Sequence, residues 1–175
     1  EAELYRAYFH WALSELVAGD PRHEPVREIL RRQIDLVNVL AALELVRDRE
    51  RGAPREREEP IPGGRIAERT LAEIAGCRAM EAAFEALAGT YFSPGVEKGI
   101  LAYGQARSLA VMERFLETTI VEYGCRLFRV DMLGVGVPLG FLWRKYGELV
   151  NIRMLARGAA YRMPMNAIRE GMVIV

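Results

Sequence analysis

Histidine and cysteine are the side chains that most often carry catalysis or bind transition metals, and this chain has few of them. Its two histidines are His10 and His23, and its two cysteines are Cys77 and Cys125. Their spacing matches no zinc-ligand pattern and no disulfide framework. We therefore expect no catalytic residue, no metal site and no bound cofactor. One alternative stays open: Cys125 lies beside Arg126, and a neighbouring cation can activate a thiol as a nucleophile.

Three glycines, Gly134, Gly136 and Gly140, approach the spacing of a dinucleotide-binding loop. Such a loop follows a β-strand, and an acidic residue that binds the ribose comes about twenty residues later. Here the preceding segment has a helical pattern, and residues 151–162 contain no acidic residue. The context therefore argues against dinucleotide binding. The chain also has no Walker-type phosphate loop, so we do not expect it to bind ATP.

An internal similarity is the most informative pattern in the sequence. Residues 29–39 (ILRRQIDLVNV) match residues 142–152 (LWRKYGELVNI) at a constant offset. A recurrence of this kind indicates two copies of one helical unit.

Each copy carries an acidic residue and an asparagine, which are Asp35 with Asn38 and Glu148 with Asn151. The two members lie three residues apart, on one face of a helix and among large apolar side chains. On a half-buried face, the carboxylate and the amide need hydrogen-bond partners, which the backbone of the following segment can supply. We expect both pairs to be structural motifs that hold their helical units together.

The elements that position these residues are predicted to be helices almost throughout. Apolar side chains recur every three to four residues, and no stretch shows sustained alternation, so the fold class is all-α, a set of repeated helical bundle units. The predicted helices cover residues 4–17, 24–49, 70–75, 78–87, 95–106, 109–128, 139–157 and a short segment that ends at 170.

Two connecting segments interrupt this pattern. The first, RDRERGAPREREEP, is rich in charge and is predicted to be exposed. The second, IPGGRI, contains Gly63 and Gly64, which predict a turn because other residues resist positive φ angles.

Charge and length exclude several function classes. The chain has 24 basic and 24 acidic residues, a balance that argues against a general nucleic-acid binder or a polybasic membrane binder. No apolar run is long enough to span a bilayer. The balance is uneven along the chain: residues 1–100 carry a net charge of −4 and residues 101–175 carry +4. This asymmetry suits a connector that contacts different partners at its two ends.

Basic residues are prominent on the last long helix. Arg144, Lys145, Arg153 and Arg157 are either its solvent-exposed face or a set of contacts to the carboxylates of a partner protein.

Four segments together resemble a known family. They are IDLVNVLAALEL, IPGGRI, AGTYF and GELVNIRMLARGAAYRMPMNAIRE, in this order along the chain. The chain resembles the C subunit of the archaeal and bacterial V/A-type ATP synthases, whose eukaryotic counterpart is the d subunit of the vacuolar proton pump. The first copy departs from the signature, because it has Leu40 and Glu44 where the second has Arg153 and Arg157.

The resemblance implies a non-catalytic rotor subunit. Members of the family are funnels of three similar helical subdomains, which form a socket between the central stalk and the membrane proteolipid ring. The implied partners are the central-stalk subunits and this ring, and the implied location is the cytoplasmic side, peripheral to the membrane. We divide the chain into a first helical subdomain (1–60), a connecting segment (61–106) and a second helical subdomain (107–175).

The likeness corresponds to roughly the C-terminal half of the family, and Glu1 already lies in a helical pattern. We therefore expect a piece of a longer protein, and we expect the isolated fragment to self-associate through surface that another subdomain covers. The alternative function is a general helical adaptor that binds an unrelated partner.

Overall fold

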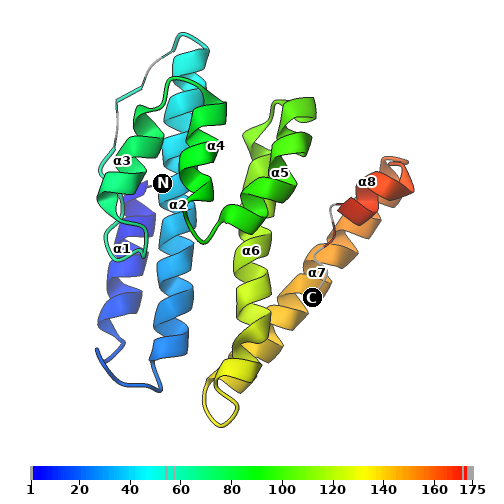
Figure 1. Ribbon diagram of the computed structural model, residues 1–175. Coiled ribbons are helices and arrows are strands. Elements are labelled where there is room, and N and C mark those ends of the chain that lie inside the picture. Colours follow the sequence, from blue (N-terminus) through cyan, green and yellow to red (C-terminus); the bar gives the residue numbers. More distant parts are fainter. Residues whose placement is uncertain (1, 54, 57, 171, 173–175) are drawn as a thin grey trace. The chain divides into compact units, whose positions relative to one another are not determined.

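The computed structural model describes residues 2–53, 55–56, 58–170 and 172 (Figure 1). Every regular element in this part of the chain is a helix, which confirms the all-α class. The helices are α1 (Ala2–Ser14), α2 (Glu24–Glu50), α3 (Glu68–Gly76), α4 (Met80–Ala88), α5 (Ser93–Ala106), α6 (Leu109–Val130), α7 (Gly136–Ala160) and α8 (Met165–Glu170).

The longest helix, α2, has clear start and stop signals. A proline in its first turn lacks the N–H group that would be unpaired there. Arg47 and Arg49 lie in its last turn, where positive charge complements the helix dipole. Gly52 follows with a φ of 75°, a left-handed conformation that ends the helix at little cost.

The chain packs as two compact units, Glu1–Thr119 and Ile120–Val175, with the boundary inside α6. The boundaries predicted from the sequence, after residues 60 and 106, both lie within the first unit. Within the first unit, residues 61–66 bond directly to α2. The division of the chain into a first helical subdomain (1–60), a connecting segment (61–106) and a second helical subdomain (107–175) stays a prediction.

In the first unit, α2 is the central helix. α1, α3 and α4 all pack against it (Figure 1). Phe9 of α1 meets Leu30 and Ile34 of α2 in an apolar cluster that also contains Ile61. This cluster fixes the start of the segment 61–66 against α2.

In the second unit, the end of α6 packs closely against α7. A Cβ atom at Gly140 would lie 2.9 Å from the backbone nitrogen of Phe128, and one at Gly124 would lie 2.4 Å from the ring of Trp143. The lack of side chains at these glycines lets the helices approach. Gly140 is thus a packing residue of a helix pair, as expected if the glycines do not form a dinucleotide loop.

No helix among the described residues is both long and apolar enough to cross a membrane.

Candidate functional site

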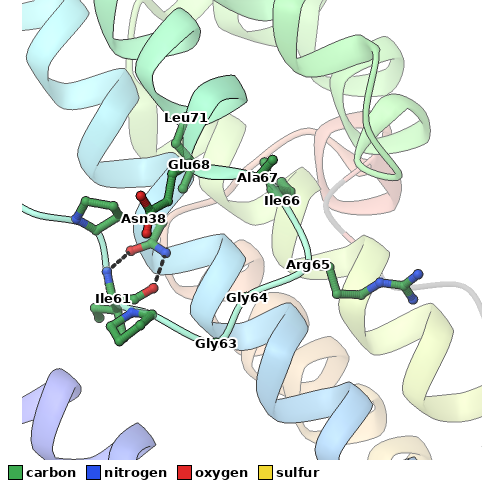
Figure 2. A pocket seen from close by; sticks show the side chains of 11 residues that line it. Asn38, Ile61, Gly63, Gly64, Arg65, Ile66, Ala67, Glu68 and Leu71 are labelled. Carbon is green, nitrogen blue, oxygen red and sulfur yellow. Dashed lines mark hydrogen bonds between the residues drawn. The ribbon is translucent and has the colours of Figure 1, made fainter.

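The segment 61–66 is fixed on α2 by the side chains of Asp35 and Asn38, and we call this arrangement the helix–loop junction. Asn38 forms a two-bond pair with the backbone of Ile61 (Figure 2). Its Nδ2 donates to the carbonyl oxygen of Ile61, and its Oδ1 accepts from the N–H of Ile61, both at 2.8 Å. The amide thus imitates a strand partner and satisfies both backbone groups of a buried residue.

Asp35 receives hydrogen bonds from three different groups. The N–H of Arg65 donates to both carboxylate oxygens at 3.0 Å, and the N–H of Ile66 donates to Oδ1 at 3.1 Å. The hydroxyl of Tyr91 donates to Oδ2 at 2.8 Å. Since Asp35 has no exposed surface, these donors replace the water that it loses on folding.

Burial dominates the electrostatics of this carboxylate. It raises the pKa of Asp35 above its ordinary value of 3.8, and the hydrogen bonds from Ile66, Tyr91 and Arg65 oppose that shift. Burial, followed by the nearby negative charge of Asp35, also raises the pKa of Tyr91 far above 10. Tyr91 therefore stays a hydroxyl donor throughout the physiological pH range.

The two glycines of the turn have different roles. Gly63 has a φ of 99°, which favours glycine. At Gly64 the constraint is space, because a Cβ atom there would lie only 2.1 Å from Oδ1 of Asp35. The turn can therefore approach the buried carboxylate only where this side chain is missing.

An ion-pair cluster borders the junction. Glu28 pairs with Arg32, one turn away at 2.9 Å, and with the side chain of Arg65. The guanidinium of Arg32 lies over the Tyr91 ring, 4.4 Å from its centroid. These contacts connect α2 to Arg65 and to Tyr91. The side chains of Arg32 and Glu28 are nearly buried.

A small pocket of about 250 Å³ lies beside the junction, and Figure 2 shows the residues that line it. The lining is Asn38, Leu71 and the backbone and side chains of residues 60–68. It brings together no pair of a nucleophile and a base. Among the described residues, no three His, Cys, Asp or Glu side chains are close enough to hold a metal ion. Asn38 reaches this pocket as the hydrogen-bond partner of the Ile61 backbone.

The second acidic–asparagine pair has different surroundings. Glu148 of α7 is exposed, and it accepts a hydrogen bond from Lys145 at 2.8 Å. Asn151 is half-buried and has an interaction partner within the protein. The described residues contain no loop on Glu148 like the one that covers Asp35. The role of this pair in holding its unit together stays a prediction.

The basic residues of α7 fall into two groups. The guanidinium of Arg144 lies 4.4 Å from the centroid of the Phe128 ring, so it has a packing role within the unit. Lys145 is engaged with Glu148 and lies near Phe141. Arg153 and Arg157 are exposed, and no ion pair joins them to other described residues.

The candidate nucleophile is placed where it cannot easily react. Cys125 is 1% exposed and packs with Val121 beside Trp143 and Val150. Burial raises its pKa, although the positive charge of Arg144 opposes the shift. A buried thiol with a raised pKa is a packing residue. The histidines are also separate: His10 is exposed, and His23 accepts a hydrogen bond from the N–H of Val17 at 2.9 Å.

Comparison with known proteins gives the family. The sequence profile described as "ATP synthase (C/AC39) subunit" matches residues 1–171. The chain belongs to this family. The match confirms the resemblance seen in the four sequence segments.

Several relatives, each named as the C subunit of an A-type ATP synthase, align with nearly the whole chain. The protein from Haloferax volcanii is 28% identical over 100% of this chain and 49% of its own length. The protein from Desulfurococcus sp. (strain SY) is 28% identical over 90% of this chain and 42% of its own length. The protein from Methanocaldococcus jannaschii is 21% identical over 93% of this chain and 41% of its own length. The chain thus spans less than half the length of these relatives. No solved structure gives a significant match.

Two sets of contacts at the junction could not be predicted from the sequence. Tyr91 lies in the AGTYF segment that carries part of the family resemblance, but helical periodicity does not predict its hydrogen bond to Asp35. The ion pair of Glu28 with Arg65 joins residues far apart in sequence. Only the fold brings these groups together.

Proposed function

We propose that this chain is part of a non-catalytic rotor subunit of an A/V-type ATP synthase. In this role it couples the central stalk to the membrane proteolipid ring, on the cytoplasmic side and peripheral to the membrane. The observation that carries the proposal is the family match over residues 1–171, together with relatives named as C subunits of A-type ATP synthases.

The geometry supports a mechanical role. A part that transmits torque needs helices that keep their positions under load, and the helix–loop junction supplies buried, fully bonded polar contacts between elements distant in sequence. The side chains of Asp35 and Asn38 bond to the backbone of the segment 61–66, and we assign them a structural role. Arg153 and Arg157, exposed on α7, are the proposed contacts to acidic residues of a neighbouring subunit.

An add-back experiment tests this coupling. Membranes of the organism that makes this protein, stripped of the subunit, receive either the full-length wild-type subunit or its Arg153→Glu/Arg157→Glu form. We expect the wild type to restore ATP-driven ion uptake, and the double variant to restore less than half as much. ATP hydrolysis by the membranes that receive the double variant should continue, because the soluble sector that hydrolyses ATP is separate from this subunit.

The matched control is Arg69→Glu/Arg78→Glu, which makes the same charge change at exposed residues of the first unit. This control should behave as the wild type. Full ion uptake with the Arg153→Glu/Arg157→Glu form would remove these two residues from the proposed interface, and a subunit that restores no uptake in its wild-type form would contradict the coupling role.

A further inference from the structure

The corner between α3 and α4 is short and lacks caps of its own. Residues 77–79 alone join the two helices. The last turn of α3 has no basic residue, and Ala79, the N-cap residue of α4, makes no side-chain hydrogen bond to its helix. The last carbonyls and the first N–H groups of a helix have no partner within it. Both helix ends therefore need partners from another element.

Two consecutive residues in the last turn of α2 provide these partners. The guanidinium of Arg49 donates to the carbonyl oxygens of Cys77 and of Ala75, the latter at 3.0 Å. Oε1 of Glu50 accepts from the N–H of Met80, the first residue of α4, at 2.7 Å. A cation thus lies at the carboxyl end of α3 and an anion at the amino end of α4. These are the signs of charge that the two helix dipoles favour.

The corner is also part of the buried interior of the first unit. α2 packs against both α3 and α4 (Figure 1). The side chains of Ile74 and Met80, on either side of the corner, are 0% exposed, and so is that of Val46 of α2. Movement of the corner away from α2 would bring these apolar side chains into water, which costs free energy.

We propose that Arg49 and Glu50 form a clamp through which the last turn of α2 keeps the α3–α4 corner closed. The two residues are adjacent in one turn, so fraying of that turn withdraws both caps together. The last turn of α2 and the corner then open as one local unit. The inference concerns the first unit by itself and does not depend on the proposed coupling role.

Hydrogen exchange of the full-length protein tests the clamp. Mass spectrometry follows peptides that contain the Met80 amide, and each rate is divided by that of peptides around Val39 of α2, so that global unfolding cancels. Glu50→Ala removes the acceptor, and we expect the Met80 amide to exchange about fivefold faster. Glu50→Gln keeps an oxygen that accepts a hydrogen bond, so it should restore most of the protection.

A change outside the clamp tests whether the corner follows the last turn of α2. Gly52 has a φ of 75°, and a Cβ atom there would meet nothing within 4 Å. Alanine at this position strains the end of α2 without touching the corner, so we expect the Met80 amide to exchange about threefold faster. The matched control is Gly19→Ala, which has a φ of 78° and equal space. It should leave the exchange of Met80 relative to Val39 unchanged.

Three outcomes would overturn the proposal. The first is unchanged exchange of the Met80 amide in Glu50→Ala. The second is equal exchange in Gly52→Ala and Gly19→Ala, because the corner would then not follow the end of α2. The third comes from Arg49→Ala, which leaves the bond between Glu50 and Met80 in place. The clamp predicts about twofold faster exchange at Met80 in this variant, and no change there would make Arg49 and Glu50 independent caps.

Discussion

At the scale of single residues, Asp35 and Asn38 turn a helix surface into an attachment point for a loop. Burying a carboxylate is costly unless hydrogen bonds replace its water, and here three groups donate to Asp35. Asn38 supplies hydrogen-bond partners to both the N–H and the carbonyl group of Ile61. Each side chain matters mainly because its removal leaves buried partners unsatisfied.

Replacement of Asn38 by leucine tests this directly. The variant leaves both the N–H and the carbonyl of Ile61 without their partner, so we expect the free energy of unfolding to fall by about 2–3 kcal/mol. Urea denaturation followed by circular dichroism measures the change. Gln105→Leu replaces an exposed amide in the same way and should change stability by less than about 0.5 kcal/mol. Equal effects of the two substitutions would rule out a special role for the Asn38 pair.

The pH dependence of stability reports on Asp35. Because its native pKa is raised above the value of 3.8, the titration of Asp35 favours the folded state most below pH 3.8. This contribution is lost as the pH rises through the native pKa. The stability advantage of the wild type over Asp35→Asn should therefore shrink from acidic to neutral pH, as measured by urea denaturation at several pH values. An advantage that grows with pH would mean that the hydrogen bonds, and not burial, dominate the pKa.

Thiol labelling tests the packing role of Cys125. In the folded protein at pH 8, we expect Cys77, which is half-exposed, to react with a thiol reagent and Cys125 to stay unmodified. Both should react in denaturant. Mass spectrometry of the digested protein assigns the label. Rapid labelling of Cys125 in the folded state would contradict the packing role and favour the alternative in which Cys125 acts as a nucleophile.

At the scale of elements, the helices follow from local patterns, while their contacts do not. Periodic apolar residues predict a helix over residues 24–49, and the structure gives α2 as Glu24–Glu50. The sequence also indicates that the acidic–asparagine pairs need backbone partners. It could not show that the acidic residue is buried in one copy and exposed in the other, because the burial of Asp35 and of Glu148 depends on what packs against each helix.

The turn at Gly64 lies so close to Asp35 of α2 that a larger side chain there should disturb the packing of the turn on the helix. Gly64→Ala should destabilise the protein by about 1–3 kcal/mol, since the new methyl group overlaps the Asp35 carboxylate and forces the turn away. Gly76→Ala is the matched control, because a Cβ atom there meets nothing within 4 Å. Thermal unfolding of both variants gives the comparison. A tolerated Gly64→Ala substitution would show that the turn can shift without loss.

At the scale of the whole molecule, the chain is one portion of a larger assembly in the proposed function. Its net charge of zero is the sum of −4 in residues 1–100 and +4 in residues 101–175, an asymmetry that suits the proposed connector between different partners. The family match covers nearly the whole chain, yet the chain covers less than half of its relatives.

Affinity purification from the organism that makes this protein tests the central claim most directly. The protein is tagged at its genomic locus, gently solubilised membranes are passed over the affinity resin, and the recovered proteins are quantified by mass spectrometry. We expect central-stalk and proteolipid subunits of an ATP synthase to be recovered together with the tagged protein. Recovery of an unrelated partner without those subunits would contradict the proposed function and favour the helical adaptor.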